Sequence, residues 1–352
     1  MLNKCCLATF PLLPSVPISM SQDTNTFEPL LRELGLVNSP SPKLTPLTGG
    51  VSCEIYLVED GGRLFVVKRA LAKLKVAADW FADVSRNHTE QACLRYIAGF
   101  RPDAVPAILF SDEKHGLFAM EFLDGFANWK SDMLAGVCDT DLARKAGALL
   151  GAIHARSWGD PAVERDFDTT ANFDQLRLDP YLRATAAKHP ALEAAILAEA
   201  SRLASTRECL VHGDFSPKNL LHHQGRLVLL DCEVAWYGDP SFDLSFFLNH
   251  FFLKSLAHSP KAPPFPSMIA AARAGYRDSN PDHYAVVEER TCRLLPMLML
   301  ARVDGKSPVE YLTHVEKKDF VRCFATRHIQ HPPASLDALV TDWFGQLNQL
   351  HP

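Results

Sequence analysis

Four residues in one short stretch of the chain have the types and the spacing that phosphoryl transfer requires. His212, Gly213 and Asp214 are followed by Asn219, at the fifth position after the aspartate. In a His-x-Asp-x-x-x-x-Asn frame, a kinase catalytic loop supplies first a base and then a metal ligand. Asp214 is therefore expected to accept the hydroxyl proton of an acceptor, and Asn219 is expected to bind a metal ion.

Two further acidic residues follow within the next fifteen positions. Residues 220–230 predict two short strands joined by a turn at 222–226, so that Asn219 folds back beside Asp231. An amide oxygen and a carboxylate suit Mg²⁺, which prefers hard oxygen ligands and also keeps waters and substrate phosphates. If the second strand continues, side chains at i and i+2 share a face, and Asp231 and Glu233 both point at the metal.

Upstream of these residues, a glycine-containing loop and a lysine have the order expected of a nucleotide clamp. Residues 54–58 and 64–68 predict two strands joined by a tight turn, and Lys68 closes the second strand. In a kinase small lobe, a loop of this kind covers the ATP phosphates and the lysine contacts the α- and β-phosphates. The alternative is that the glycines before the first strand form an ordinary turn without a nucleotide contact. The candidate loop residues are Gly49, Gly50 and Ser52.

An acidic residue on the following helix is a candidate partner for Lys68. Residues 87–97 predict a helix that carries Glu90, which lies 22 residues beyond Lys68 (90 − 68 = 22). That separation suits the strand-to-helix ion pair of kinases. The alternative is a solvated carboxylate at the start of a helix, where the helix dipole favours negative charge.

The pattern changes from strands to helices near Gly125, where we place the boundary between two lobes. Residues 107–110 and 117–122 predict two more strands before it. Beyond it, residues 141–156 predict a helix whose Gly147 and Gly151 allow close packing, and residues 172–183 predict an irregular segment around Pro180. The other predicted helices are 184–205, 242–256, 267–276 and 284–300. The fold class that follows is α+β.

The composition narrows the classes of function. The chain has 352 residues, of which 47% are hydrophobic and 22% charged, as expected of a globular protein with a sizeable core. A net charge of −5 argues against a nucleic-acid partner, and no run reaches the ~18 apolar residues of a membrane span. Nine scattered cysteines without a C-x-x-C pair favour free thiols in a reducing compartment, the cytoplasm.

The motif residues resemble the aminoglycoside phosphotransferase and choline kinase superfamily. The resemblance rests on His212 to Asp214, on Asn219, and on the later Gly238-Asp239-Pro240 and Asp243. It implies a two-lobed protein-kinase-like fold, a segment around Glu121 that offers backbone groups to adenine, and an Asp243 that supports the catalytic loop. The segment Asp231-Cys232-Glu233 is similar to that of methylthioribose kinases. That branch lacks an asparagine at the position of Asn219, so its substrate is not assigned to this chain.

Together these features predict an enzyme that uses ATP and Mg²⁺ to phosphorylate a hydroxyl of a small molecule, such as a sugar, an amino alcohol or an aminoglycoside. Residues 23–124 are expected to form the nucleotide-binding lobe and residues 125–352 the catalytic and acceptor-binding lobe. Residues 1–22 are expected to lie outside the fold, with a true start at Met20. The alternatives are a nucleotide-binding pseudokinase that acts as a scaffold, and a protein kinase. The acceptor and the oligomeric state stay open.

Overall fold

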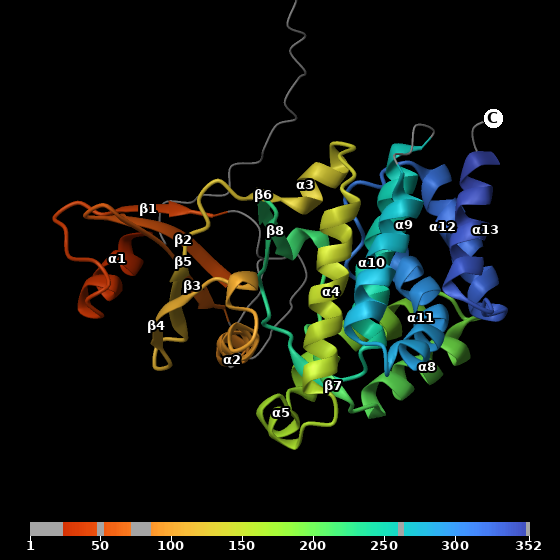
Figure 1. Ribbon diagram of the computed structural model, residues 1–352, viewed down its shortest axis with the longest axis horizontal. Coiled ribbons are helices and arrows are strands. Elements are labelled where there is room, and N and C mark those ends of the chain that lie inside the picture. Colours follow the sequence, from red (N-terminus) through yellow and green to blue (C-terminus); the bar gives the residue numbers. More distant parts are fainter. Residues whose placement is uncertain (1–23, 48–52, 72–85, 260–263, 350–352) are drawn as a thin grey trace, which may run out of the picture.

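The computed structural model describes residues 24–47, 53–71, 86–259 and 264–349. These residues form a small lobe built on an antiparallel sheet and a larger lobe made mostly of helices (Figure 1). The fold class is therefore the predicted one. The proposed boundary near residue 125 falls between β5 (Leu117–Glu121) of the first sheet and β6 (Ala127–Asn128), which pairs with a strand of the large lobe.

The small lobe contains one five-stranded sheet in the order β1-β2-β3-β5-β4, with every neighbouring pair antiparallel. Its remaining strands are β1 (Lys43–Pro46), β2 (Cys53–Asp60), β3 (Arg63–Ala70) and β4 (Ile108–Asp112). The predicted β2–β3 hairpin forms, with Gly61 and Gly62 at positive φ as a two-residue turn requires. Helix α1 (Thr24–Glu33) packs Phe27 and Leu31 against one face of this sheet.

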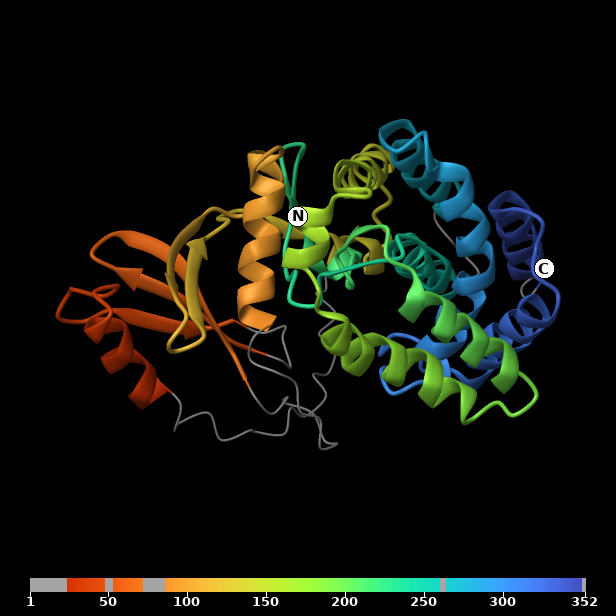
Figure 2. The same ribbon diagram turned by 90° about the horizontal axis from the view of Figure 1, so that it is seen from below.

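Helix α2 (Arg86–Ala98) lies between the sheet and the large lobe, as the orange helix in Figure 2 shows. Its buried residues Leu94 and Ile97 belong to the same apolar cluster as the core of the large lobe, together with Phe118 of β5. A helix that buries its apolar face against both lobes fixes their relative position. This position matters for the site, because α2 also carries Glu90.

Short strands in the large lobe frame the predicted catalytic loop. Strand β7 (Cys209–Val211) pairs with β10 (Trp236–Gly238), and β8 (Leu220–His223) pairs with β9 (Arg226–Leu229). The predicted hairpin over residues 220–230 is thus confirmed. The catalytic-loop residues leave β7 and reach β8 through a 3₁₀ turn, η3 (Pro217–Asn219).

Helix α9 (Ser241–His258) is the centre of the large lobe. Every residue from 241 to 256 in it is buried, so it has no solvated face and is surrounded by other helices. The large lobe also contains helices α3 (Trp129–Leu134), α4 (Thr140–Ser157), α5 (Pro161–Asp166), α8 (Glu193–Ser205), α10 (Phe265–Ser279), α11 (Tyr284–Asp304), α12 (Val315–Gln330) and α13 (Leu336–Gln349). Among the described helices, none combines the length and the apolar character needed to cross a bilayer.

Two predictions for residues 172–205 are wrong. Residues 172–183 are not irregular, because α6 (Thr170–Phe173), a π-helical segment (Asp174–Arg183) and α7 (Ala184–Ala186) form one continuous helix. The wider π turn accommodates Pro180, which lacks an N–H and would clash in an α-helix. The predicted helix over 184–205 is broken at 187–192, because the residue before Pro190 is disfavoured in the α conformation.

Close contact between α4 and α10 depends on small residues, as the sequence predicted for Gly147 and Gly151. A Cβ at Gly147 would lie 1.9 Å from the backbone oxygen of Ala272, and one at Gly275 would lie 2.1 Å from that of Arg144. Both obstacles are backbone atoms, which cannot rotate away. The two helices, side by side in Figure 1, therefore pack at a distance that only glycine permits at these points.

We predict that Gly147→Ala destabilises the protein by about 3 kcal/mol, because the added methyl forces α4 and α10 apart. The matched control is Gly345→Ala in the exposed face of α13, where no atom lies within 4 Å of the added Cβ. That control should gain about 0.5–1 kcal/mol from the better helix propensity of alanine. Urea unfolding midpoints measure both changes, and equal midpoints for the two variants would contradict the packing argument.

Candidate active site

The catalytic loop is held by the carboxylate of Asp243 at the start of α9. Its Oδ2 accepts the backbone N–H of His212 at 2.6 Å, and its Oδ1 accepts that of Gly213 at 2.9 Å. Gly213 has φ +75°, and a Cβ there would lie 2.6 Å from the backbone oxygen of Val234. Both facts require glycine at this position. The supporting role that the resemblance implied for Asp243 is confirmed.

His212 orients the loop through both ring nitrogens. Its Nε2 donates to the backbone oxygen of Leu230 at 3.1 Å, and its Nδ1 accepts the backbone N–H of Asp214 at 3.1 Å. With this pattern, one ring nitrogen holds the backbone of the loop and the other holds the backbone that leads to Asp231. His212 therefore connects the loop to the end of the β8–β9 hairpin.

Asn219 lies beside both Asp214 and the segment that contains Asp231. Its side-chain Nδ2 donates to the backbone oxygen of Asp214 at 3.0 Å, and its own backbone oxygen accepts the N–H of Leu230 at 2.9 Å. The first bond fixes the amide orientation. The second brings the residue before Asp231 against Asn219, as the hairpin predicted.

The carboxylate of Asp214 is buried and faces two cations. Lys218 Nζ lies 2.8 Å and Arg177 Nη2 lies 3.3 Å from its Oδ2. Burial alone would raise the pKa of Asp214, but the charges of Lys218 and Arg177 outweigh it and hold that pKa below its usual range. Asp214 is therefore ionised at neutral pH and able to accept a proton.

Lys68 forms the ion pair with Glu90 that the sequence spacing predicted, and also binds Asp231. Its Nζ lies 2.7 Å from Glu90 Oε2 and 2.6 Å from Asp231 Oδ1. Lys68 and Glu90 are almost fully buried, whereas 28% of the Asp231 side chain is exposed. Burial raises the pKa of Glu90 to about 7 even though Lys68 opposes this change. Burial also acts to raise the pKa of Asp231, but the Lys68 charge outweighs it and holds that pKa low.

The geometry predicted for Glu233 is wrong. Strand β9 ends at Leu229 and Asp231 has φ +65°, so the chain turns and the i, i+2 alternation of a strand does not apply. Glu233 Oε2 instead accepts from Arg86 Nε of α2 at 3.1 Å and from the Cys53 thiol at 3.4 Å. The predicted metal role of Glu233 loses its geometric basis and stays a prediction.

The structure gives less support to the other predicted nucleotide contacts, Glu121 and the glycine-containing loop. Glu121 ends β5 between the lobes, as expected, but its Oε2 accepts the backbone N–H of Ala107 at 3.2 Å and its Oε1 lies 3.6 Å from Arg226. Its side chain is therefore engaged within the protein, and an adenine contact there stays a prediction. The predicted phosphate loop of Gly49, Gly50 and Ser52 lies outside the described residues.

The donor set around Asp214 fits a hard divalent cation. In the described ranges, no group of three or more His, Cys, Asp and Glu side chains is arranged to hold a metal ion. Mg²⁺ does not need such a cage, because it is usually bound by one or two protein oxygens together with waters and substrate phosphates. Asp231, whose carboxylate is ionised and partly exposed, and Asn219, whose amide is fixed in orientation, are donors of that kind.

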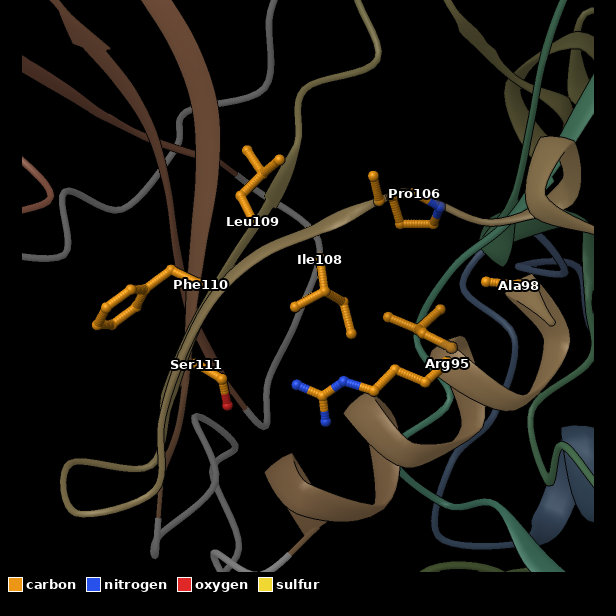
Figure 3. A pocket seen from close by; sticks show the side chains of 9 residues that line it. Arg95, Ala98, Pro106, Ile108, Leu109, Phe110 and Ser111 are labelled. Atoms are coloured by element: carbon orange, nitrogen blue, oxygen red, sulfur yellow. The ribbon is translucent and has the colours of Figure 1, made fainter.

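A groove of about 440 Å³ lies outside this site, between α2 and β4. Figure 3 shows Arg95 and Ile108 between the helix and the strand, with Leu109 and Phe110 further along β4. Neither Lys68 nor Asp214 lines this groove. It is therefore separate from the candidate active site.

Three residues were missed or underrated by the sequence analysis. Lys218 lies in the catalytic loop, and its i, i+4 relation to Asp214 was the available signal. Arg177 lies on the π-helical segment that was expected to be irregular, and Arg86 precedes the predicted start of α2. No local pattern marks a contact such as Arg86 to Glu233, which spans 147 positions.

Comparisons with known proteins agree with this geometry. The model of the phosphotransferase enzyme family matches residues 43–289, more than half of the chain. A methylthioribose kinase of Bacillus pumilus is 24% identical over an alignment of 220 positions, and the match covers 54% of this chain and 55% of that kinase. One of Bacillus cereus is 20% identical over an alignment of 229 positions that covers 58% of each protein. The chain thus spans little more than half the length of these curated relatives.

Solved structures resemble the whole two-lobed fold. A choline kinase from Cryptosporidium parvum superposes with a TM-score of 0.56 at 11% identity, covering 90% of this chain and 99% of that one. An amicoumacin kinase in complex with AMP-PNP, Ca²⁺ and Ami superposes with a TM-score of 0.52 at 16% identity, covering 95% of this chain and 97% of that one. At these identities the likeness concerns the fold alone. The catalytic-loop geometry, the protein-kinase-like fold and the family match together show that the chain belongs to the phosphotransferase enzyme family.

Proposed function

We propose that this protein transfers the γ-phosphate of ATP to a hydroxyl group of a small molecule. The observation that carries the proposal is the ionised, buried Asp214 on a loop fixed by Asp243 and His212. A carboxylate held in this way orients an acceptor hydroxyl and accepts its proton as the oxygen attacks the phosphate. The curated relatives are methylthioribose kinases, and both cited structures are kinases of small molecules, which supports this class of reaction.

Lys68, Asn219 and Asp231 are assigned to the nucleotide side of the reaction. Lys68 contacts the ATP phosphates while Glu90 keeps its ammonium group in place. Asn219 and Asp231 hold Mg²⁺, which neutralises charge on the phosphates during transfer. The AMP-PNP and Ca²⁺ in the amicoumacin kinase complex support a nucleotide and a divalent cation in this fold. Glu233 is assigned to anchoring α2 through Arg86.

The competing functions differ in what the chain must provide. Only residues 232–240 separate Asp231 from α9, which leaves no room for a long activation loop that would bind a peptide. A small acceptor therefore fits better than a protein substrate. A pseudokinase scaffold is disfavoured by the joint presence of Lys68, Asp214 and Asp231 in one ionised arrangement. The free cysteines of the described residues favour the cytoplasm as the compartment.

We predict that Asp214→Asn lowers phosphoryl transfer by about 10²- to 10⁴-fold, because the amide cannot accept the hydroxyl proton. Mg²⁺-ATP binding should be retained, since Asp214 contacts the acceptor. Acceptor-stimulated ADP release across sugars, amino alcohols and aminoglycosides measures the first effect, and calorimetric titration with ATP measures the second. Asp278→Asn on the surface of α10 is the matched control. Near-normal turnover of Asp214→Asn would refute the assignment of the base.

We predict that Asp231→Asn raises the Mg²⁺ concentration needed for half-maximal activity at least about tenfold, because a metal-binding oxygen loses its charge. Glu233→Gln should leave that concentration unchanged. It should instead destabilise the protein by about 1–3 kcal/mol, because Arg86 loses a charged hydrogen bond. Mg²⁺ titrations of activity and urea unfolding separate the two effects. A Mg²⁺ requirement raised in Glu233→Gln to the same degree would return Glu233 to the metal site.

A further inference from the structure

A row of side chains runs along one face of α9, starting beside Asp214. Phe246, His250 and Lys254 are spaced four residues apart, so they lie above one another on the helix. The Arg177 guanidinium, which pairs with Asp214, lies 5.9 Å from the Phe246 ring centre. The Phe246 and His250 rings meet edge to face at 5.3 Å. This row therefore leads from Asp214 into the helical lobe.

Lys254 is a buried cation that forms no ion pair with any described carboxylate. Its side chain is fully buried, and its Nζ lies 3.4 Å from His250 Nδ1 and 5.0 Å from the Tyr311 ring centre. Burial lowers the pKa of Lys254 to about 7, and the charges of Lys130 and Arg302 add to the effect. A buried ammonium group of this kind is costly unless something compensates for its charge.

Arg302 of α11 is a second cation without a carboxylate partner in the described chain. Its Nη1 donates to the hydroxyls of Tyr181 and Ser307 at 3.2 and 2.9 Å, and to the backbone oxygen of Ser307. Its guanidinium lies 5.7 Å from the Tyr181 ring centre, and Arg177 lies 5.8 Å from the same centre. Tyr181 thus separates Arg302 from the arginine that pairs with Asp214.

Several buried polar atoms around these cations have no hydrogen-bond partner among the described residues. They are Arg302 Nε, His250 Nε2 and the Tyr311 hydroxyl. His250 Nδ1 faces the Lys254 ammonium group, and burial together with surrounding cations holds the pKa of His250 well below its usual range. The proton of the neutral ring is then on Nε2, so all three atoms can donate. Buried donors in folded proteins are almost always satisfied by protein, water or ligand.

The charges of this region are unbalanced. Five cationic side chains lie around Asp214 and His250, and among the described residues they form ion pairs with two carboxylates, Asp214 and Glu310. The charges of Asp231 and Glu233 also act on Arg177, and that of Asp231 acts on Lys218. Glu310 pairs with Lys130 at 2.5 Å, and Asp214 pairs with Lys218 and Arg177. Lys254 and Arg302 are left with positive charge and unused donors. A choline-like or aminoglycoside-like cation would be repelled here, whereas an anion would be attracted.

We propose that the acceptor carries an anionic group, a carboxylate or a phosphate, and that Lys254, Arg302 and His250 bind this group while the acceptor hydroxyl meets Asp214. The inference rests on the proposed function and specifies its substrate class as a hydroxy acid or a phosphorylated alcohol. The anion supplies the acceptors that Arg302 Nε, His250 Nε2 and the Tyr311 hydroxyl lack. It also compensates the charge of Lys254.

The test is binding of inorganic phosphate and of acetate by calorimetry, with Mg²⁺-ADP present to occupy the nucleotide side. We expect saturable binding that Lys254→Met weakens about tenfold or more, because a charged hydrogen-bond donor is lost. Tyr311→Phe should weaken it about threefold. Lys145→Met on the exposed face of α4 is the matched control and should bind as the wild type does. Preference for phosphate or for acetate identifies the anion.

Three outcomes would overturn the proposal. These are equal anion affinity in Lys254→Met and the wild type, no saturable binding by the wild type, or preferential binding of choline. Lys254→Met keeps an unbranched four-atom side chain and removes the buried ammonium group, so loss of folding is not expected. Asp214→Asn should still bind the anions. Failure of Mg²⁺-ADP to bind would refute the proposed function, but it would leave Lys254-dependent anion binding intact.

The pH dependence of stability gives an independent prediction. The groups that face Lys254 are His250 of α9, Arg302 of α11, Lys130 of α3, and Glu310 and Tyr311 before α12. An unfolded lysine titrates near about 10.4, whereas the pKa of Lys254 in the fold is about 7. Between these values the unfolded chain binds more protons, so this residue makes the wild type more stable as pH rises from 7 to 10.

Lys254→Met should therefore stabilise the protein at pH 6 and lose that advantage by pH 10. Urea unfolding of both proteins at pH 6, 8 and 10 measures the difference, and the subtraction cancels titration of other groups, Glu90 included. Acetate affinity of the wild type should fall above pH 7, because an anion binds the protonated lysine. An identical pH dependence of the two proteins would show that Lys254 does not titrate in this range and would contradict the proposed charge state.

Discussion

The ion pairs of Lys68 hold together the parts on which the candidate site depends. One ammonium group on β3 binds Glu90 of α2 and Asp231, which follows the β8–β9 hairpin of the large lobe. The sheet, helix α2 and the segment that carries Asp231 thus meet at a single buried charge. Removal of any one partner leaves an uncompensated charge in a region with little water, which costs more than an exposed ion pair contributes. The arrangement specifies one relative position of the lobes.

Helix α2 is attached at two points along its length. Glu90 binds Lys68, and Arg86 binds Glu233 just beyond Asp231. Its apolar residues meanwhile belong to the core of the large lobe. A movement of α2 would therefore change the position of Lys68 and the surroundings of Asp231 together. Glu233, which is a candidate metal ligand in the sequence, contacts Arg86 of this helix in the fold.

Asp214 separates two electrostatic environments. On the side proposed for the nucleotide lie Lys68 and the oxygens of Asn219 and Asp231, which suit a metal ion and phosphates. On its other side, Arg177, Arg302 and Lys254 give an excess of positive charge. Lys218 and Arg177 keep Asp214 ionised against the effect of burial, because nearby positive charge favours the carboxylate.

The sequence by itself determined the local elements. The turn at Gly61 and Gly62, the hairpin over 220–230 and the helix around Glu90 follow from periodicity and turn chemistry, and their spacing predicted the Lys68–Glu90 pair. It did not determine the direction of Glu233, because the positive φ of Asp231 ends the alternation of the strand. The partners of Asp214 and the unpaired charge of Lys254 were decided only by the tertiary structure. Around Asp214 and Lys254, charged side chains meet that come from helices far apart in the sequence. Burial makes the interactions between these charges strong.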